Sequence, residues 1–239
     1  MRRVVAYLKV QVKSYLAAKS SIFVSLLFPV MMTFIFGAIM PKGYLKEVVP
    51  GLVGFSILSY SLFSMTAISS KFRFTNIFAQ LSLTPLKKSE WLFSVFLWNV
   101  AIGALSFLVV ITITHFAFSV SISLNILIVG YLLAASLLFV SLGLLIGTVA
   151  SSIETASLVG NAVGLPMMML TGTFFPITML PDYLQKGVQF LPLYYFVKGM
   201  GDLMVASKPE DAIVNLVILA GLAAIFFVVA TILFKWRKT

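Results

Sequence analysis

The chain has 239 residues, of which 61% are hydrophobic and 10% are charged, and its mean hydropathy is +1.09. A water-soluble domain could not cover this much apolar surface, so the composition excludes one and predicts an all-α integral membrane protein. The net charge is +10. In a membrane protein such a charge favours the anionic leaflet, so we expect membrane lipid as a partner and no nucleic acid.

Six apolar runs are long enough to cross a bilayer as helices. They cover residues 21–40, 50–70, 91–115, 124–150, 155–173 and 212–234. The connections between them are short. We therefore predict one transmembrane domain over residues 1–239, located in the cell membrane as a multi-pass protein.

Residues 1–20 are too polar to span a membrane. Val4, Leu8 and Val12 fall on one helical stripe, whereas Lys9 falls on another. This pattern predicts an amphipathic helix lying in the membrane interface. A signal peptide is the alternative, but no small-residue cleavage site follows the first apolar run.

The longest polar loop, residues 71–90, follows the second apolar run. Its centre can form two helical turns, which end at Thr84-Pro85 because the residue before proline avoids the helical conformation. These turns expose apolar side chains, which either a protein partner or the inner leaflet must cover. The candidate contact residues are Asn76, Ile77, Phe78, Gln80, Leu81, Thr84 and Pro85.

Two pairs of glycines lie four residues apart in the fourth and fifth apolar runs. They are Gly143 with Gly147 and Gly160 with Gly164. Small residues at this spacing let helices approach closely. The pattern fits packing within one subunit and packing at a subunit interface equally well.

Residues 151–154 connect these two runs. The sequence Ser-Ser-Ile-Glu predicts a capping box, in which Ser151 caps the next helix and Glu154 reaches back to it. Contact of Glu154 with a cytoplasmic partner is the alternative.

Residues 174–211 join the fifth apolar run to the sixth and contain several prolines. Prolines set among aromatic and aliphatic residues favour short helices that begin or end at a proline. We predict a re-entrant helical cap on the outer side of the membrane. Its candidate residues are Phe174, Phe175, Pro176, Pro181, Pro192 and Tyr195.

Charge predicts the orientation of the chain. With both termini in the cytoplasm, the inner segments hold twelve cations and the outer segments hold five, in agreement with the positive-inside rule. The inner cations are Arg2, Arg3, Lys9, Lys13, Lys19, Lys71, Arg73, Lys87, Lys88, Lys235, Arg237 and Lys238. The outer cations are Lys42, Lys46, Lys186, Lys198 and Lys208.

The sequence lacks the motifs that carry catalysis. It contains no G-x-x-x-x-G-K-[ST], G-x-S-x-G or H-E-x-x-H sequence, and no charge lies in the middle of an apolar run. His115 is the only histidine, and there is no cysteine. We therefore expect no catalytic residue, no metal site and no cofactor in this chain, which is not predicted to be an enzyme.

One stretch carries a family resemblance. The run LPMMMLTGTFFP at residues 165–176, followed by Leu180-Pro181, Pro192-Leu193 and Tyr195, resembles the signature of the type-2 ATP-binding-cassette (ABC) transporter permeases. The resemblance implies the membrane subunit of an ATP-driven exporter. It also implies a second permease subunit, identical or different, and two copies of a separate ABC ATP-binding subunit that binds ATP and magnesium.

The resemblance assigns roles to the predicted segments. Residues 1–20 would be the elbow helix, residues 71–90 the coupling segment that docks on the ATP-binding subunit, and residues 174–211 the extracytoplasmic cap. Family members often carry glutamate where this chain has Ala79, so Phe78 and Leu81 would have to make the docking contact by apolar packing. The first and fifth spans would lie at the dimer seam.

The absence of charge within the spans favours a lipid-like or amphipathic drug substrate, although polysaccharide exporters of this class also use uncharged walls. Two other functions stay open. The chain could be a non-transporting membrane anchor or sensor for a partner ATPase, or a passive channel that conducts without nucleotide.

Overall fold

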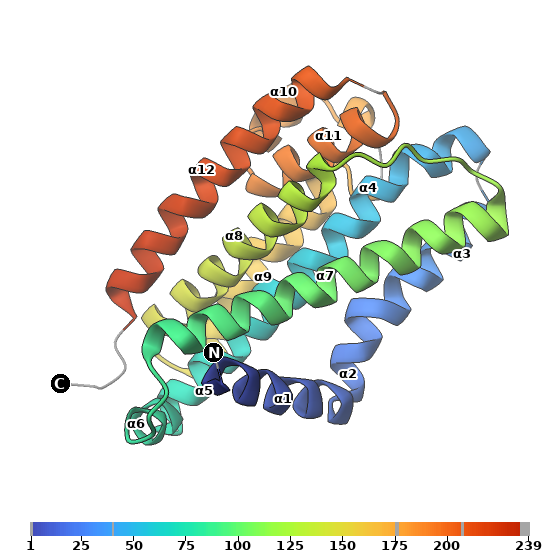
Figure 1. The fold of residues 1–239 in the computed structure, drawn as a ribbon. Helices are drawn as coiled ribbons and strands as arrows, with labels where there is room; N and C mark the ends of the chain where they lie inside the picture. Colours follow the sequence, from blue (N-terminus) through green and yellow to red (C-terminus); the bar gives the residue numbers. More distant parts are fainter. Residues whose placement is uncertain (1, 40, 175–176, 207, 235–239) are drawn as a thin grey trace.

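The computed structural model describes residues 2–39, 41–174, 177–206 and 208–234 (Figure 1). All regular secondary structure in these residues is helical. Phe175 and Pro176 of the predicted cap lie outside the described residues, as do the cations Lys235, Arg237 and Lys238.

The first half of the chain contains α1 (Arg2–Ala17), α2 (Lys19–Ile22), η1 (Phe23–Leu27), α3 (Phe28–Ile39), α4 (Lys42–Leu58), η2 (Ser59–Ser64), α5 (Met65–Phe74), α6 (Ile77–Ser82) and α7 (Lys88–Phe118). The second half contains α8 (Leu127–Val149), α9 (Ile153–Leu170), η3 (Ile177–Met179), α10 (Asp182–Val188), α11 (Pro192–Met204) and α12 (Pro209–Leu233). The segments η1 and η2 are π-helical, and η3 is a single 3₁₀ turn.

Five described helices are long and apolar enough to cross a membrane. They are Gly43–Phe74, Lys88–Phe118, Leu127–Val149, Ile153–Leu170 and Pro209–Leu233. Each corresponds to one of the predicted apolar runs. The first predicted run, residues 21–40, contains a shorter apolar helix, Ser25–Ile39.

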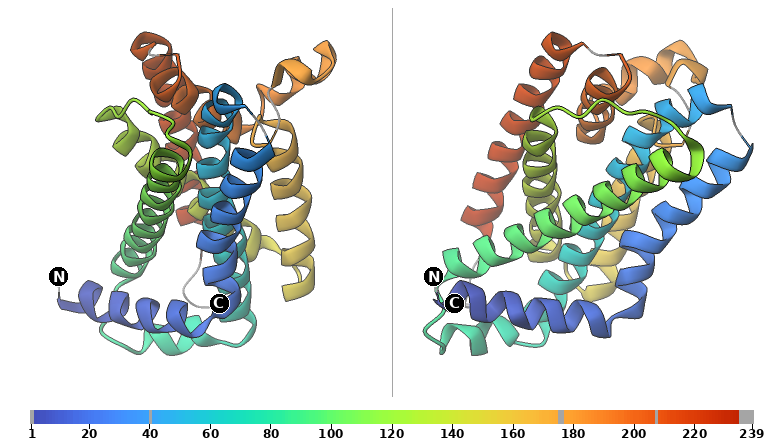
Figure 2. Two further views of the ribbon diagram at one scale, coloured as in Figure 1. Left: turned by 90° about the vertical axis from the view of Figure 1, so that its right-hand side faces the viewer. Right: turned by 45° about the vertical axis from the view of Figure 1, so that its right-hand side comes forward.

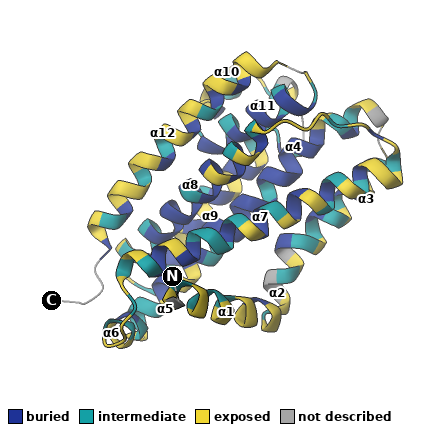
Figure 3. Cartoon of the chain, viewed as in Figure 1, coloured by how far each residue is buried: buried dark blue, intermediate teal, exposed yellow. Residues whose placement is uncertain are grey.

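The continuous helix formed by α4, η2 and α5 lies at the centre of the bundle. Of its most apolar 18-residue stretch, 83% is buried inside the fold, whereas only 17% of the corresponding stretch of α12 is buried. Figure 3 shows the same contrast, with α4 largely dark blue and the outer face of α12 yellow. The apolar residues of α12 therefore face outward, as expected for a helix that contacts lipid.

Several other helices pack around this central helix, whereas α12 packs against α8 and α11. α8 lies against both α5 and α12, while α3 and α7 pack against α4, and α9 packs against η2 and α5. The two views in Figure 2 show α1 running across one end of the bundle, with α6 at that same end. α10 and α11 lie at the opposite end.

The paired glycines allow α8 and α9 to approach the central helix. A Cβ at Gly143 would lie 2.6 Å from the Leu62 carbonyl oxygen, and one at Gly164 would lie 2.6 Å from the Phe63 ring. Gly147 lies against Ser70 in the same way. Gly160 has ordinary contact distances to Thr66. Within this chain, both pairs thus serve packing inside the subunit.

Helix α11 is amphipathic and inserts its apolar face into the main core. Leu193, Phe196 and Met200 are completely buried there, against α4, α8 and α12. Gly199 faces the ring of Tyr131, whose hydroxyl donates a hydrogen bond to the Ala212 carbonyl oxygen at 2.6 Å. The predicted cap region is therefore packed onto the bundle by its own apolar face.

Candidate functional site

Helix α6 is a short helix between two of the long apolar helices, at the end of the bundle crossed by α1 (Figure 1). The turn before it is made by Asn76, which adopts a left-handed conformation with φ of 56°. Asparagine tolerates this conformation better than most residues. The Thr84 hydroxyl donates to the Leu81 carbonyl oxygen at 2.7 Å just after the helix ends at Ser82. Both helix boundaries are thus fixed locally.

The expectation of an exposed Phe78 is wrong. Only 6% of Phe78 is exposed, and its ring packs edge-on against Trp91 and Phe234, with centroids 5.2 and 4.8 Å away. Trp91 comes from α7 and Phe234 follows α12, so the partners are distant in sequence. We call Phe72, Phe78, Trp91, Phe234 and Tyr7 the α6 aromatic cluster. Phe78 therefore anchors α6 to the bundle.

Ile77 and Leu81 are partly buried, and Leu81 packs against the same cluster. The outer face of α6 and the loop after it is formed by other residues. The exposed residues are Asn76, Ala79, Gln80, Leu83, Thr84 and Pro85. Among these residues, Leu83 has the largest apolar side chain, and 78% of it is exposed. The accessible surface here therefore comes from residues such as Gln80 and Leu83 and not from Phe78.

Two cations close the ends of neighbouring helices beside α6. Arg73 donates hydrogen bonds to the carbonyl oxygens of Thr148 and Ala150, the latter at 2.8 Å, at the end of α8. Lys88 donates to the carbonyl oxygens of Thr231 and Phe234 at 2.7 and 2.6 Å, at the end of α12. The last carbonyls of a helix lack intrahelical partners and carry partial negative charge. The two segments that flank α6 are thereby tied to α8 and α12.

Helix α1 is tied to the same end. Arg3 donates to the Pro85 carbonyl oxygen at 2.6 Å, and Trp91 donates its indole N–H to the Tyr7 hydroxyl at 2.8 Å. Burial raises the pKa of Tyr7, and the hydrogen bond from Trp91 opposes part of that effect. The start of α1, the loop after α6 and the first turn of α7 therefore form one connected unit.

The predicted capping box at residues 151–154 is wrong, because the N-cap lies one residue later and Thr155, not Glu154, takes the N3 position. Ser152, not Ser151, is the N-cap of α9, and its hydroxyl oxygen accepts a hydrogen bond from the Thr155 amide at 3.0 Å. Ser151 donates instead to the Thr155 hydroxyl. Two adjacent serines offer the same chemistry, and the extended backbone of Ser152 decides between them. Glu154 is exposed in the first turn of α9.

The described cap residues lie at the end opposite α6. Pro181 immediately precedes α10, and Pro192 is the first residue of α11. Phe174 packs against Phe55 of α4, with ring centroids 5.6 Å apart. Tyr195 is partly buried against the main core. The two prolines occupy positions where the missing N–H is not needed.

Comparison with known proteins assigns the chain to a family. Residues 2–205 match the ABC-2 type transporter family. The chain belongs to this family. It is 25% identical over 156 residues to the inner membrane transport permease YadH of Escherichia coli K12, covering 65% of this chain and 61% of YadH.

Two further relatives are matched over a smaller share of their own length. The probable multidrug ABC transporter permease YbhS of Escherichia coli K12 is 28% identical over 159 residues, which cover 65% of this chain and 41% of YbhS. The putative transport permease YvfS of Bacillus subtilis 168 is 32% identical over 79 residues, or 33% of this chain and 32% of YvfS. This chain thus spans less than two thirds of each relative. Family membership and the long apolar helices identify a multi-pass membrane protein.

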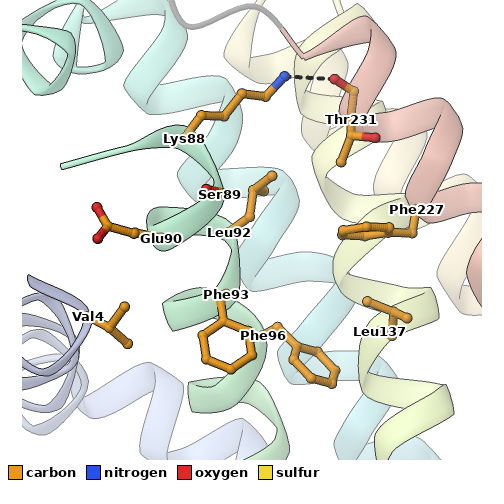
Figure 4. A pocket seen from close by; sticks show the side chains of 10 residues that line it. All are labelled: Val4, Lys88, Ser89, Glu90, Leu92, Phe93, Phe96, Leu137, Phe227 and Thr231. Carbon is orange, nitrogen blue, oxygen red and sulfur yellow. Dashed lines mark hydrogen bonds between the residues drawn. The ribbon is translucent and has the colours of Figure 1, made fainter. Parts of the chain in front are cut away.

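In this ABC-2 family member, a pocket of about 810 Å³ lies between the start of α1, α7, α8 and α12 (Figure 4). Phe93, Phe96 and Phe227 form its apolar walls. Two of its polar side chains have partners: Lys88 caps α12, and a carboxylate oxygen of Glu90 accepts from the Lys87 amide at 2.8 Å. The lining of the pocket is therefore mainly apolar.

Sequence reasoning did not find the capping roles of Arg73 and Lys88. Both were read as cations of the inner face only. A local signal exists, since each cation lies at the end of an apolar run, where another helix must also end. Which helix end each side chain reaches depends on the packing of α5 against α8 and on the position of the first turn of α7 beside α12.

Proposed function

We propose that this chain is the membrane subunit of an ATP-driven exporter, and that a separate ABC ATP-binding subunit docks on the outer face of α6. The proposal rests on one observation: α6 and the loop after it have one exposed face, and the opposite face is anchored in the bundle. Gln80 and Leu83 are exposed, while Phe78 connects the same helix to α7 and the end of α12. Force applied to α6 would therefore reach the long helices directly.

The proposed orientation places α6 in the cytoplasm. Arg3, Lys71, Arg73, Lys87 and Lys88 belong to segments at the α6 end of the bundle (Figure 2). The segments of Lys186, Lys198 and Lys208 lie at the α10 end. The larger group of cations belongs on the cytoplasmic side by the positive-inside rule.

The sixth membrane crossing is assigned to the helical residues 19–39, which include α2, η1 and α3. At 1.5 Å per residue this path is about 30 Å long, close to the thickness of the hydrocarbon core. α1 would lie in the cytoplasmic interface, because apolar Val5 and Leu16 are 51% and 64% exposed on it. Residues 174–211 would form the re-entrant outer cap.

A second permease subunit, identical or different, would pack against α3 and α9. Both helices flank the central helix and leave large apolar side chains uncovered within this chain: Phe34 is 48% exposed, Leu158 is 69% exposed and Met169 is 66% exposed. Two ATP-binding subunits would then bind the two α6 faces, each supplying the site for ATP and magnesium. A lipid-like or amphipathic substrate fits the uncharged helices between them.

Docking is tested by purifying the tagged chain from its native membrane, with and without the substitution Leu83→Asp. We expect a soluble protein with a Walker lysine to copurify in equal amount with the unsubstituted chain. Leu83→Asp should reduce its recovery at least about tenfold, because a buried carboxylate without a partner costs several kcal/mol.

The matched control is Leu124→Asp, because Leu124 is 68% exposed and lies beyond α7, away from α6. It should leave copurification unchanged. If both variants retain the ATPase equally, α6 is not the docking site. If no ATPase accompanies the unsubstituted chain, the exporter proposal fails, and the passive channel takes its place.

A further inference from the structure

A second pocket, of about 770 Å³, lies between α1, the η2–α5 segment, α6 and α7. We call it the α1 pocket. Its long wall is one stripe of the central helix, on which lining residues recur at helical spacing from Tyr60 to Lys71. This stretch of helix rises about 15 Å, so the pocket is elongated along the central helix. A pocket of this volume is within the range that holds small molecules.

The end of the α1 pocket at Tyr60, deeper in the bundle, is aromatic. The Trp98 indole N–H donates a hydrogen bond to the Tyr60 hydroxyl at 2.6 Å, and Tyr15 packs edge-on against the Tyr60 and Trp98 rings, with centroids 5.6 and 5.5 Å away. Ser59 Oγ and Asn99 Oδ1 are almost completely covered and do not face the cavity. The polar atoms of this end are therefore paired or covered, and its wall offers rings on which an acyl chain can pack.

The other end of the central-helix stripe carries a cation. Lys71 lies in the last turn of α5, is exposed and forms no ion pair with any residue that the structure describes. Ser14 and Ser64, neither of which is fully buried, add hydroxyl groups to the lining. Among the described residues that line the pocket, none carries a carboxylate. This end is therefore complementary in charge to an anionic group.

We propose that the α1 pocket binds one anionic phospholipid, with its phosphate group beside Lys71 and an acyl chain along the rings of Tyr60 and Trp98. The order from charged to apolar along the central helix matches the order of head group and chain in a membrane leaflet. Val10 and Ile68 line the pocket and are exposed apolar residues, so an acyl chain can enter between them from the bilayer. Only the choice of the cytoplasmic leaflet rests on the orientation proposed above.

The test is native mass spectrometry of the chain, purified in detergent and titrated with phosphatidylglycerol or with phosphatidylcholine that carries the same acyl chains. The two lipids differ in the net charge of the head group. We expect one tight site that prefers phosphatidylglycerol about fivefold, which is the effect of one lysine near an anionic head group. Lys71→Met keeps the apolar stem, so it should abolish this preference and leave the binding of phosphatidylcholine unchanged.

A substitution that fills the pocket tests the site itself. Ala67 lines the pocket and is exposed, so Ala67→Phe adds a ring to the cavity without disturbing the core. It should weaken the binding of both lipids at least about tenfold. The matched controls lie at exposed positions outside the lining: Ala79→Phe on α6 for Ala67→Phe, and Lys13→Met on α1 for Lys71→Met. Both controls should bind the two lipids as the unsubstituted chain does.

Equal affinity for the two lipids, a preference that survives Lys71→Met, or equal affinity of Ala67→Phe and Ala79→Phe would overturn the proposal. Lipids extracted from the chain after purification from its native membrane identify the occupant. An anionic phospholipid that is retained by the unsubstituted chain and depleted in Ala67→Phe supports a resident lipid, whereas a different anionic amphiphile depleted in the same way overturns that choice. Neither measurement requires an ATP-binding subunit, so failure of the docking experiment leaves both results interpretable.

Discussion

Asn76 sets the angle between α5 and α6 through a single backbone conformation. Its φ of 56° is accessible to glycine without strain and is poorly accessible to a β-branched residue. We expect Asn76→Gly to change the free energy of unfolding little, and Asn76→Val to lower it by about 1–2 kcal/mol. Thermal unfolding of the two purified variants in detergent measures the difference. Equal melting temperatures would show that α6 does not require this turn.

Asp202 lies where α11 meets α12, and its environment disfavours its charge. Burial raises its pKa and so does nearby Asp211, whereas Lys198, Lys208 and a 3.1 Å hydrogen bond from Asn215 oppose the shift. A carboxyl whose pKa is raised by folding stabilises the fold below its unfolded pKa and loses that contribution as the pH rises through its folded pKa.

Asp202→Asn should therefore gain stability relative to the unsubstituted chain as the pH rises from about 4 toward neutrality. Melting temperatures measured across this interval test the sign of the change. Glu47→Gln, which removes an exposed carboxylate from α4, is the control for the loss of one negative charge. A difference that shrinks with rising pH would contradict the assignment.

Single residues also show where sequence reasoning reached its limit. The exposure of Phe78 depends on Trp91 and Phe234, whose positions follow only from the packing of α7 and α12 around α6. The choice between Ser151 and Ser152 depends on one backbone conformation. No local pattern specifies either of these.

Elements were more predictable than single contacts, because a bilayer-length apolar run has few alternatives to a helix. Each of the five long candidates contains most of a predicted run, and α1 falls within the predicted amphipathic segment. The π-helical segments η1 and η2 were not predicted. They require one extra residue per turn inside a helix, for which neither Phe23–Leu27 nor Ser59–Ser64 carries a compositional signal.

The approach of α8 to the central helix depends on glycine. A Cβ at Gly147 would lie 2.8 Å from the Ser70 amide nitrogen and 2.9 Å from the Thr66 carbonyl oxygen, so backbone would have to move. We expect Gly147→Ala to lower the free energy of unfolding by about 1–3 kcal/mol. Gly221→Ala, on the outer side of α12 with nothing within 4 Å, should stabilise slightly through helix propensity. Denaturant titration of both variants distinguishes packing from propensity.

At the scale of the whole molecule, Lys88 connects the start of α7 to the end of α12. Lys88→Met keeps the apolar stem but leaves two terminal carbonyls of α12 without this donor. We expect a loss of about 1–2 kcal/mol and faster hydrogen exchange in the last turn of α12. Lys87→Met changes the exposed neighbour and should leave exchange unaffected. If hydrogen exchange in the last turn of α12 is equally fast in both variants, the contact of Lys88 with these carbonyls does not stabilise the helix end.

The two hydrogen-bonded tryptophans of α7 have a spectroscopic consequence. Trp91 and Trp98 are seven residues apart, and their indole groups donate to Tyr7 and Tyr60 respectively. Seven residues are nearly two helical turns, so both indoles lie on one side of α7. Trp91 senses the α6 aromatic cluster, and Trp98 lines the α1 pocket between α1, the η2–α5 segment, α6 and α7. The sequence has a third tryptophan, Trp236. With Trp236 replaced by phenylalanine, replacing Trp91 or Trp98 in turn would leave one intrinsic fluorophore that reports changes at α6 or at this pocket without any added label.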